Sequence, residues 1–358
     1  MNNPIADALQ PFVDRHMLAG AVTLIASKDA VLSLDAVGWA DIAARRPMRA
    51  NTLFWVASQT KPVTATAVMM LVDEGRLNLD DPVARHLPEF KDRMVIAEQD
   101  ADHVLLRKAG HAITVRELLS HAAGLAFKSP LEEPTLDLLP LDIAVRSHAM
   151  LPLQFEPGTK YQYSNAGINT AARILEVITG EAYEDFLRAR LLDPLGMKDT
   201  TFRPRAGQQR RLAKPYKSNA AKNGLEETTI QQLQYPLGDR RRQPMPAGGL
   251  FSTAPDMARF CRMILNGGTL DSRRYVSEEA VRQMTRKQTP DGVPDEYGLG
   301  WATAGGTFGH GGAHSTDMTI DSARGLVRIY MVQHVDFSDA GEVKNHSYAA
   351  FKQAVNAM

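Results

Sequence analysis

The sequence has almost no cysteine and no excess of charge. Its 358 residues contain a single cysteine, Cys261, so no intramolecular disulfide can form and no cluster of thiolates is available to bind a metal. Lysine and arginine total 41, and aspartate and glutamate also total 41, which gives a net charge of zero. A neutral chain has no overall field to attract a nucleic acid or an anionic membrane. We therefore expect no nucleic-acid partner.

Long apolar runs are also missing. No stretch approaches the roughly 20 consecutive apolar residues that a membrane-spanning helix needs. The chain begins MNNPIADALQPFVDRHM, without the basic start and the continuous apolar segment of a signal peptide. We expect no membrane span and a cytoplasmic location for the chain as given. A periplasmic or secreted location would apply if a signal peptide had been removed.

The chain has enough apolar residues, 44%, to bury a large core. β-rich runs lie near both chain ends, and the residues between them have mainly helical periodicity. This order predicts an α+β protein with one antiparallel sheet built from both chain ends and helices on its faces. We predict one catalytic unit over residues 1–358, in which residues 1–76 and 289–358 form a sheet subdomain. Residues 77–288 form a mainly helical subdomain with loops that border a cleft.

Individual elements follow from the same periodicities. Helices are predicted at residues 5–17, 115–121, 166–179, 183–192, 253–266, 277–288 and 342–357. Strands are predicted at residues 21–26, 31–37, 297–302, 307–310, 313–320 and 326–333. The polar, weakly periodic residues 205–247 are predicted to be long loops with short strands.

The stretch Ser58-Gln59-Thr60-Lys61-Pro62 precedes an apolar run that predicts a buried helix. Because proline is tolerated only in the first turn of a helix, Ser58 is expected at the helix N-terminus. Backbone N–H groups there favour the negative charge that develops beside a hydroxyl during attack. Lys61 shares the helix face of Ser58, and burial disfavours its ammonium form, so the pair can act as nucleophile and base. The alternative is a capping serine beside a surface lysine.

Two later stretches favour the catalytic interpretation. Tyr163-Ser164-Asn165 follows a turn-rich loop and precedes a predicted helix, and His310-Gly311-Gly312-Ala313 lies at the edge of a predicted strand. Glycines at such an edge allow a substrate to approach the backbone closely. The order of S-x-x-K, an aromatic hydroxyl with an amide, and then a basic residue with glycine is that of serine β-lactamases and penicillin-binding proteins.

With these motifs, the sequence resembles the class C β-lactamase family, which includes family VIII carboxylesterases and DD-peptidases. The similarity extends over most of the chain and includes residues 118–125, 193–197 and 247–252. The resemblance implies a β-lactamase/transpeptidase-like fold and a serine hydrolase that acts on a small-molecule ester or amide without a cofactor. The sequence does not specify an oligomeric state.

The resemblance also implies a role for each motif residue. Ser58 attacks a carbonyl and becomes acylated, while Lys61 and Tyr163 pass its proton to the leaving group. A tyrosine pKa of ~10 would have to fall by roughly three units for the phenolate to dominate at neutral pH. We therefore expect Lys61 and Tyr163 to titrate as a coupled pair. Asn165 would orient Lys61 and the acyl group of the substrate.

The third motif is expected to bind substrate through His310, Gly311, Gly312 and Ala313, with the backbone N–H groups of Ser58 and Ala313 as the oxyanion hole. It also departs from the family pattern, because typical class C β-lactamases have Lys-Thr-Gly where this chain has His310-Gly311-Gly312. A mostly neutral histidine loses a charge-assisted contact to a carboxylate that is worth about 1.5–3 kcal/mol.

This departure favours short-chain neutral esters, and hence a carboxylesterase, over penicillins. The alternatives are a β-lactamase or D-amino-acid peptidase, and a penicillin-binding or acyl-sensing module that is acylated without turnover. A zinc site at His310 and His314 is not expected, because no third ligand is near in the sequence.

Overall fold

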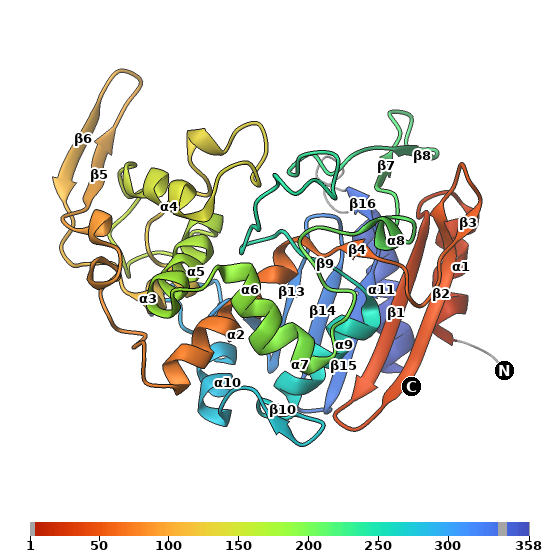
Figure 1. The fold of residues 1–358 in the computed structure, drawn as a ribbon. Helices are drawn as coiled ribbons and strands as arrows, with labels where there is room; N and C mark the ends of the chain where they lie inside the picture. Colours follow the sequence, from red (N-terminus) through yellow and green to blue (C-terminus); the bar gives the residue numbers. More distant parts are fainter. Residues whose placement is uncertain (1–3, 336–341, 358) are drawn as a thin grey trace.

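The computed structural model describes residues 4–335 and 342–357, and its centre is a seven-stranded antiparallel sheet (Figure 1). The strand order is β12-β13-β14-β15-β1-β2-β3. The bounds are β1 Gly20–Ser27, β2 Val31–Asp41, β3 Arg46–Pro47, β12 Ala302–Ala304, β13 Thr307–Gly311, β14 Asp317–Asp321 and β15 Leu326–Met331. Strand β1 pairs with β15, with Val22 opposite Met331, so the two chain ends meet in the middle of the sheet. The predicted fold class is confirmed.

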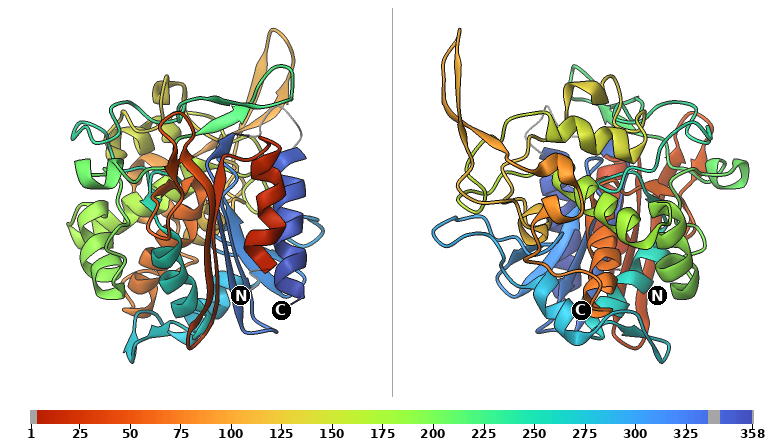
Figure 2. Two further views of the ribbon diagram at one scale, coloured as in Figure 1. Left: turned by 90° about the vertical axis from the view of Figure 1, so that its right-hand side faces the viewer. Right: turned by 60° about the vertical axis from the view of Figure 1, so that its left-hand side comes forward.

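Two helices cover one face of the sheet. Helix α1 (Pro4–Asp14) lies beside α11 (Glu342–Asn356) although they come from opposite chain ends (Figure 2). Ile5, Leu9 and Phe351 lie in one apolar cluster of buried side chains that also contains Tyr330 of β15. The spacing of Ile5, Leu9 and Val13 puts them on one face of α1, which is the face that the sheet and α11 bury.

The other face carries α9 (Ala254–Leu265), which packs on β1, β14 and β15. Beyond it, the central helix α2 (Thr60–Asp73) contacts α5 (Asn165–Thr179) and α10 (Glu278–Thr285). Twelve of the fourteen residues of α2 are buried. Its low amphipathicity therefore follows from its position, since a helix surrounded by protein on all sides has no polar face.

The predicted helices between residues 77 and 288 are present but mostly shorter than expected. Two of them are α3 Val115–Leu119 and α6 Tyr183–Leu187. The structure also contains three helices that were not predicted: α4 Leu141–Ala149, α7 Asp193–Leu195 and α8 Ala206–Gln209. The predicted helix at residues 183–192 divides into α6 and a π-helical turn, η5 (Arg188–Leu192). Short 3₁₀ turns are η1 Ala57–Gln59, η2 Val83–Arg85, η3 Pro88–Phe90 and η4 Pro130–Glu132.

Three sequence predictions need correction. The strand predicted at residues 313–320 begins only at Asp317, because residues 313–315 form a turn. The helical part contains a β-hairpin, β5 (Met94–Gln99) and β6 (Val104–Lys108), which projects from the body of the molecule (Figure 1). Residues 297–302 do not form a strand. Instead Tyr297 forms an isolated bridge with Ala302, and Gly300 between them has a φ of +76°, so the chain turns back on itself.

The polar segment of residues 205–247 consists of loops and short strands, as predicted, together with the short helix α8, which was not predicted. The remaining strands of the structure are β4 Phe54–Trp55, β7 Tyr216–Ser218, β8 Leu225–Glu227, β9 Phe251–Ser252, β10 Thr269–Leu270, β11 Arg273–Arg274 and β16 His334–Val335. β4 pairs with β9, and this pair brings the chain before Ser58 next to the chain after Ala247. Within the described ranges, no helix is both long enough and apolar enough to cross a membrane.

Candidate active site

Ser58 lies in the 3₁₀ turn η1, directly before α2. Pro62 is the third residue of α2, within the first turn, which fits the expected helix start. Ala57 before the serine has a φ of +47°, a left-handed conformation that costs a non-glycine residue energy. The side chain of Ala57 is buried against Trp55 and Phe251, and this packing holds the turn that presents Ser58.

Lys61 is fully buried and makes three short polar contacts. Its Nζ lies 3.2 Å from Ser58 Oγ, 2.8 Å from Asn165 Oδ1 and 2.7 Å from the carbonyl oxygen of Ala247. Burial lowers the pKa of Lys61 well below its usual range. Two of the three contacts are oxygens that only accept hydrogen bonds, so a neutral amine can donate to both and point its lone pair at Ser58.

Tyr163 and Asn165 come from the start of α5, which packs against α2. Ser164 between them caps the helix, since its hydroxyl accepts a hydrogen bond from the Gly167 N–H. The Tyr163 side chain is hydrogen-bonded to Ser58, and Lys61 Nζ lies 4.6 Å from the centre of its ring. Burial raises the pKa of Tyr163, and the hydrogen bond to Ser58 opposes only part of that effect. The hydroxyl is therefore protonated at neutral pH.

His310 lies on β13 beside these residues, 6.0 Å from the ring of Tyr163 between ring centres. Its Nδ1 is 2.6 Å from the Gly311 carbonyl oxygen, and its Nε2 is 3.0 Å from the Tyr297 hydroxyl. A carbonyl oxygen only accepts, so Nδ1 carries the proton, and in the neutral ring Nε2 accepts from Tyr297. A neutral His310 is thus hydrogen-bonded at both nitrogens.

Gly312 lies against the chain that leads to Ser58. A Cβ atom on Gly312 would stand 2.6 Å from the Val56 carbonyl oxygen and 2.1 Å from Thr316 Oγ1, which leaves no room for a side chain. Ala313, next along the chain, packs against the cluster that contains Trp55 and Ala57. The structure therefore places all eight predicted site residues around one point: Ser58, Lys61, Tyr163, Asn165, His310, Gly311, Gly312 and Ala313.

Three further contributors were not predicted from the sequence. The Ala247 carbonyl binds Lys61, and Tyr297 binds His310. His121 accepts a hydrogen bond from the Ser164 N–H at Nδ1, and its ring centre lies 4.6 Å from that of Tyr163. Ala247 and His121 lie in two stretches that the family resemblance includes, residues 247–252 and 118–125, but no role was assigned to either residue. Tyr297 is a single residue without a local pattern.

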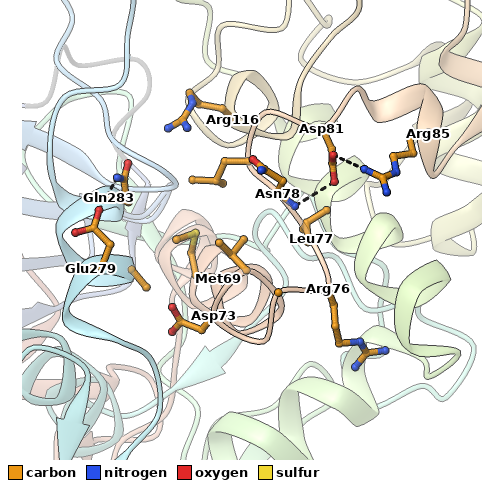
Figure 3. Close-up of a pocket in the computed structure, with 14 residues that line it drawn as sticks. Met69, Asp73, Arg76, Leu77, Asn78, Asp81, Arg85, Arg116, Glu279 and Gln283 are labelled. Carbon is orange, nitrogen blue, oxygen red and sulfur yellow. Dashed lines mark hydrogen bonds and ion pairs between the residues drawn. The ribbon is translucent and has the colours of Figure 1, made fainter.

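A separate cavity of about 430 Å³ lies at the C-terminal end of α2 (Figure 3). Its lining includes Asp73, Arg76 and Arg116, and none of the predicted site residues. Its charges are compensated, because Asp81 pairs with Arg85 at 2.7 Å and Arg116 pairs with Asp80 outside the lining at 2.7 Å. The length of α2, ~20 Å, separates this cavity from Ser58. It contains no nucleophile held beside a base.

Sequence comparison finds relatives over most of the chain. A sequence model of the family described as Beta-lactamase matches residues 5–351. The chain is 30% identical over 352 residues to Esterase EstB of Burkholderia gladioli, covering 86% of this chain and 84% of the esterase. It is 31% identical over 259 residues to Penicillin-binding protein 4 of Amycolatopsis lactamdurans, covering 70% of this chain and 62% of that protein.

Structure comparison identifies the same fold in solved proteins. EstCE1, described as a hydrolase with promiscuous acyltransferase activity, superposes with a TM-score of 0.81 at 23% identity, covering 97% of both chains. The D-amino acid amidase of Ochrobactrum anthropi superposes with a TM-score of 0.75 at 25% identity, covering 99% of both chains. Proteins similar to this chain in sequence or in fold thus include ones named for esterase, penicillin-binding and amidase activities.

Proposed function

The chain belongs to the beta-lactamase family and is a serine hydrolase, and we propose that it is a carboxylesterase for short-chain neutral esters. The acyl-enzyme would form on Ser58. The proposal rests on the position of the buried Lys61 amine, whose Nζ lies 3.2 Å from Ser58 Oγ. The other two contacts of Nζ are with oxygens that accept its hydrogen bonds, Asn165 Oδ1 and the Ala247 carbonyl.

In the acylation step, Ser58 Oγ attacks the ester carbonyl and gives its proton to Lys61 Nζ. The lowered pKa of Lys61 supplies the neutral amine that this transfer requires. Tyr163 remains a neutral hydroxyl beside Ser58 and gives a proton to the departing alkoxide, while Lys61 restores the proton of Tyr163. The ester C–O bond breaks and an alcohol leaves. Water then repeats the sequence on the acyl-enzyme and releases the carboxylic acid.

The oxygen of the tetrahedral intermediate would be held by the backbone N–H groups of Ser58 and Ala313. Two features support these donors: the position of Ser58 at the start of α2, and the close approach of Gly312 to the backbone of Val56. Asn165 contributes by fixing the Lys61 amine through Oδ1.

The preference for a neutral ester rests on His310. In typical class C β-lactamases a lysine at this position of the motif offers a cation to the substrate carboxylate. Here the side chain is an imidazole that bonds to the Gly311 carbonyl and the Tyr297 hydroxyl. A substrate carboxylate therefore loses a charge-assisted contact, which weakens its binding about tenfold to a hundredfold.

The test is a paired assay of p-nitrophenyl butyrate and a chromogenic cephalosporin, with intact mass measured during turnover. We expect rapid hydrolysis of the ester, a butyryl adduct that Ser58→Ala abolishes, and slow or no opening of the cephalosporin. Faster turnover of the cephalosporin would replace the esterase assignment with a β-lactamase. A lasting adduct without turnover would show an acyl-sensing module, and full ester hydrolysis by Ser58→Ala would exclude Ser58 as the nucleophile.

A further inference from the structure

Gln333, just after β15, bridges two segments that are far apart in the sequence. Its side chain is buried, with Oε1 3.1 Å from the backbone nitrogen of Trp55 and Nε2 2.8 Å from His314 Nδ1. Its own backbone is fixed as well, because its carbonyl accepts a hydrogen bond from the Tyr216 N–H at 2.9 Å. The amide thus joins Trp55 to His314 from a rigid position next to the central sheet.

The direction of these hydrogen bonds follows from chemistry. A backbone N–H only donates, so the side-chain oxygen of Gln333 must face Trp55 and the NH₂ group must face His314. His314 Nδ1 then accepts, which requires a neutral ring with its proton on Nε2. Burial and the neighbouring His334 lower the pKa of His314 to about 3, which agrees with a neutral ring.

Both bridged segments lead to the proposed oxyanion hole. Trp55 lies three residues before Ser58, and His314 directly follows Ala313. The two are also in direct contact, with the Trp55 and His314 rings edge-on and their centres 4.8 Å apart. The carbonyl of His314 accepts a hydrogen bond from the His334 N–H at 3.1 Å, and Trp55 Nε1 donates to the Gly248 carbonyl at 2.8 Å.

We propose that Gln333 is a positioning residue that fixes the spacing of the two oxyanion-hole donors, the N–H groups of Ser58 and Ala313. This inference rests on the proposed function, because it assumes that these N–H groups stabilise the oxyanion. An oxyanion hole requires donors within about 2.7–3.1 Å of the developing charge, and the donors here come from different parts of the chain. Gln333 touches neither donor nor substrate, and acts by holding Trp55 and His314.

The test uses Gln333→Met, which keeps the length of the side chain and removes both hydrogen bonds. Removing one oxyanion-hole donor costs about 10²–10³ in rate, so a displaced donor should lower kcat for p-nitrophenyl butyrate by roughly tenfold to a hundredfold with KM little changed. The affinity for butylboronic acid, which forms a tetrahedral adduct with an active serine, should fall by a similar factor. Gln333→Glu should restore part of kcat and part of the affinity for butylboronic acid. A carboxylate can accept a hydrogen bond from the Trp55 N–H and another from a His314 that carries its proton on Nδ1.

Gln208→Met is the matched control, because Gln208 also makes two hydrogen bonds, to the Arg205 N–H and the Asp199 carbonyl, but on α8. It should leave kcat and boronic acid affinity unchanged. The proposal is wrong if Gln333→Met lowers only the melting temperature, or lowers kcat without weakening boronic acid binding. Failure of the wild-type protein to bind boronic acid at Ser58 would instead contradict the proposed function.

Discussion

At the scale of single residues, the environment shifts two pKa values in directions that favour neutral groups. Burial lowers the pKa of Lys61 and raises the pKa of Tyr163, so an amine and a phenol face Ser58 at neutral pH. A tyrosinate base would require the opposite shift at Tyr163. The arrangement supports proton transfer first to Lys61, with Tyr163 as the second member of a relay. We predict that Lys61 and Tyr163 titrate as a coupled pair.

A double-mutant cycle tests this relay. Lys61→Ala should lower kcat about a hundredfold or more, because positioned acid-base catalysis is commonly worth about 10²–10⁴. Tyr163→Phe should behave similarly, and the double variant should lose much less than the product of the two single losses. The melting temperature of Lys61→Ala should stay unchanged or rise, since the buried amine disfavours folding at neutral pH.

The measurements are kcat on p-nitrophenyl butyrate and thermal unfolding for the four proteins of the cycle. Strictly multiplicative losses in well-folded proteins would contradict the relay while leaving Ser58 as the nucleophile. An activity of Lys61→Ala that merely follows its folded fraction would assign Lys61 a structural role.

The residues that sequence analysis identified are those with a local pattern. Ser58 and Lys61 share a motif on one helix start, and Tyr163 and Asn165 share a motif at another. Tyr297 contributes through one contact, to His310, and Gln333 through two, to Trp55 and His314. Such contacts depend on how distant segments pack, and an isolated tyrosine or glutamine does not reveal them.

At the scale of elements, the segment from Ala126 to the end of α4 supports the residues around Tyr163. The Ala126 carbonyl accepts from the Ser164 hydroxyl at 2.7 Å, and the Phe127 carbonyl accepts from the Asn165 N–H at 3.1 Å. A few residues further on, Glu132 of η4 and His148 of α4 are both buried, with Oε2 and Nε2 3.6 Å apart. The stability of this segment therefore depends on two buried titratable groups.

Their effects on stability oppose one another. Burial raises the pKa of Glu132 from 4.5 to about 7, so the folded state binds more protons between these values and stability falls as pH rises. Burial lowers the pKa of His148 from 6.5 to about 4, so the unfolded state binds more protons there and stability rises with pH. Between about pH 4.5 and 6.5 the two slopes largely cancel.

Glu132→Gln should remove this compensation. The glutamine can still accept the Ser129 N–H that Glu132 accepts at 2.7 Å, so the local turn is preserved. With His148 alone, the free energy of unfolding should fall by about 2 kcal/mol between pH 7 and pH 5, beyond any change in the wild-type protein. Urea unfolding at both pH values measures this change in the free energy of unfolding, with Glu133→Gln at the exposed neighbouring position as the control. An equal pH dependence in Glu132→Gln and the wild-type protein would contradict the prediction.

The hairpin of β5 and β6 shows why one element escaped prediction. Strands are recognised by alternation between a buried and an exposed face, but every residue of β6 is exposed, including Val104, Leu105 and Leu106. The turn of residues 100–103 also lacks the Asn-Gly or Asp-Gly signal of a tight hairpin. The helices α5 and α9 were predicted because a packed core imposes a helical period on their sequences, and α2 was predicted because its sequence is apolar on nearly every side.

At the scale of the whole molecule, α2 connects the sheet to the helical part. It carries Lys61, follows Ser58, and is buried by α5 and α10 while its apolar side chains belong to the same core as β1 and β15. The two predicted subdomains thus share one apolar core. We propose that the two subdomains unfold as one cooperative unit, as expected for the single catalytic unit predicted from the sequence.

Phe351→Ala on α11 tests whether a change in the layer of α1 and α11 destabilises the whole molecule. Phe351 is fully buried against Tyr330 in the layer formed by α1 and α11, on the face of the sheet opposite α9. Its truncation should cost about 3–5 kcal/mol and lower the melting temperature of the protein by several degrees. If the molecule unfolds as one unit, activity on p-nitrophenyl butyrate, far-UV circular dichroism and tryptophan fluorescence should all shift to the same lower midpoint. Val104→Ser on the exposed β6 should shift none of them. Activity that persists above the midpoint of the dichroism transition would show that the helical part and its site are stable without the terminal layer.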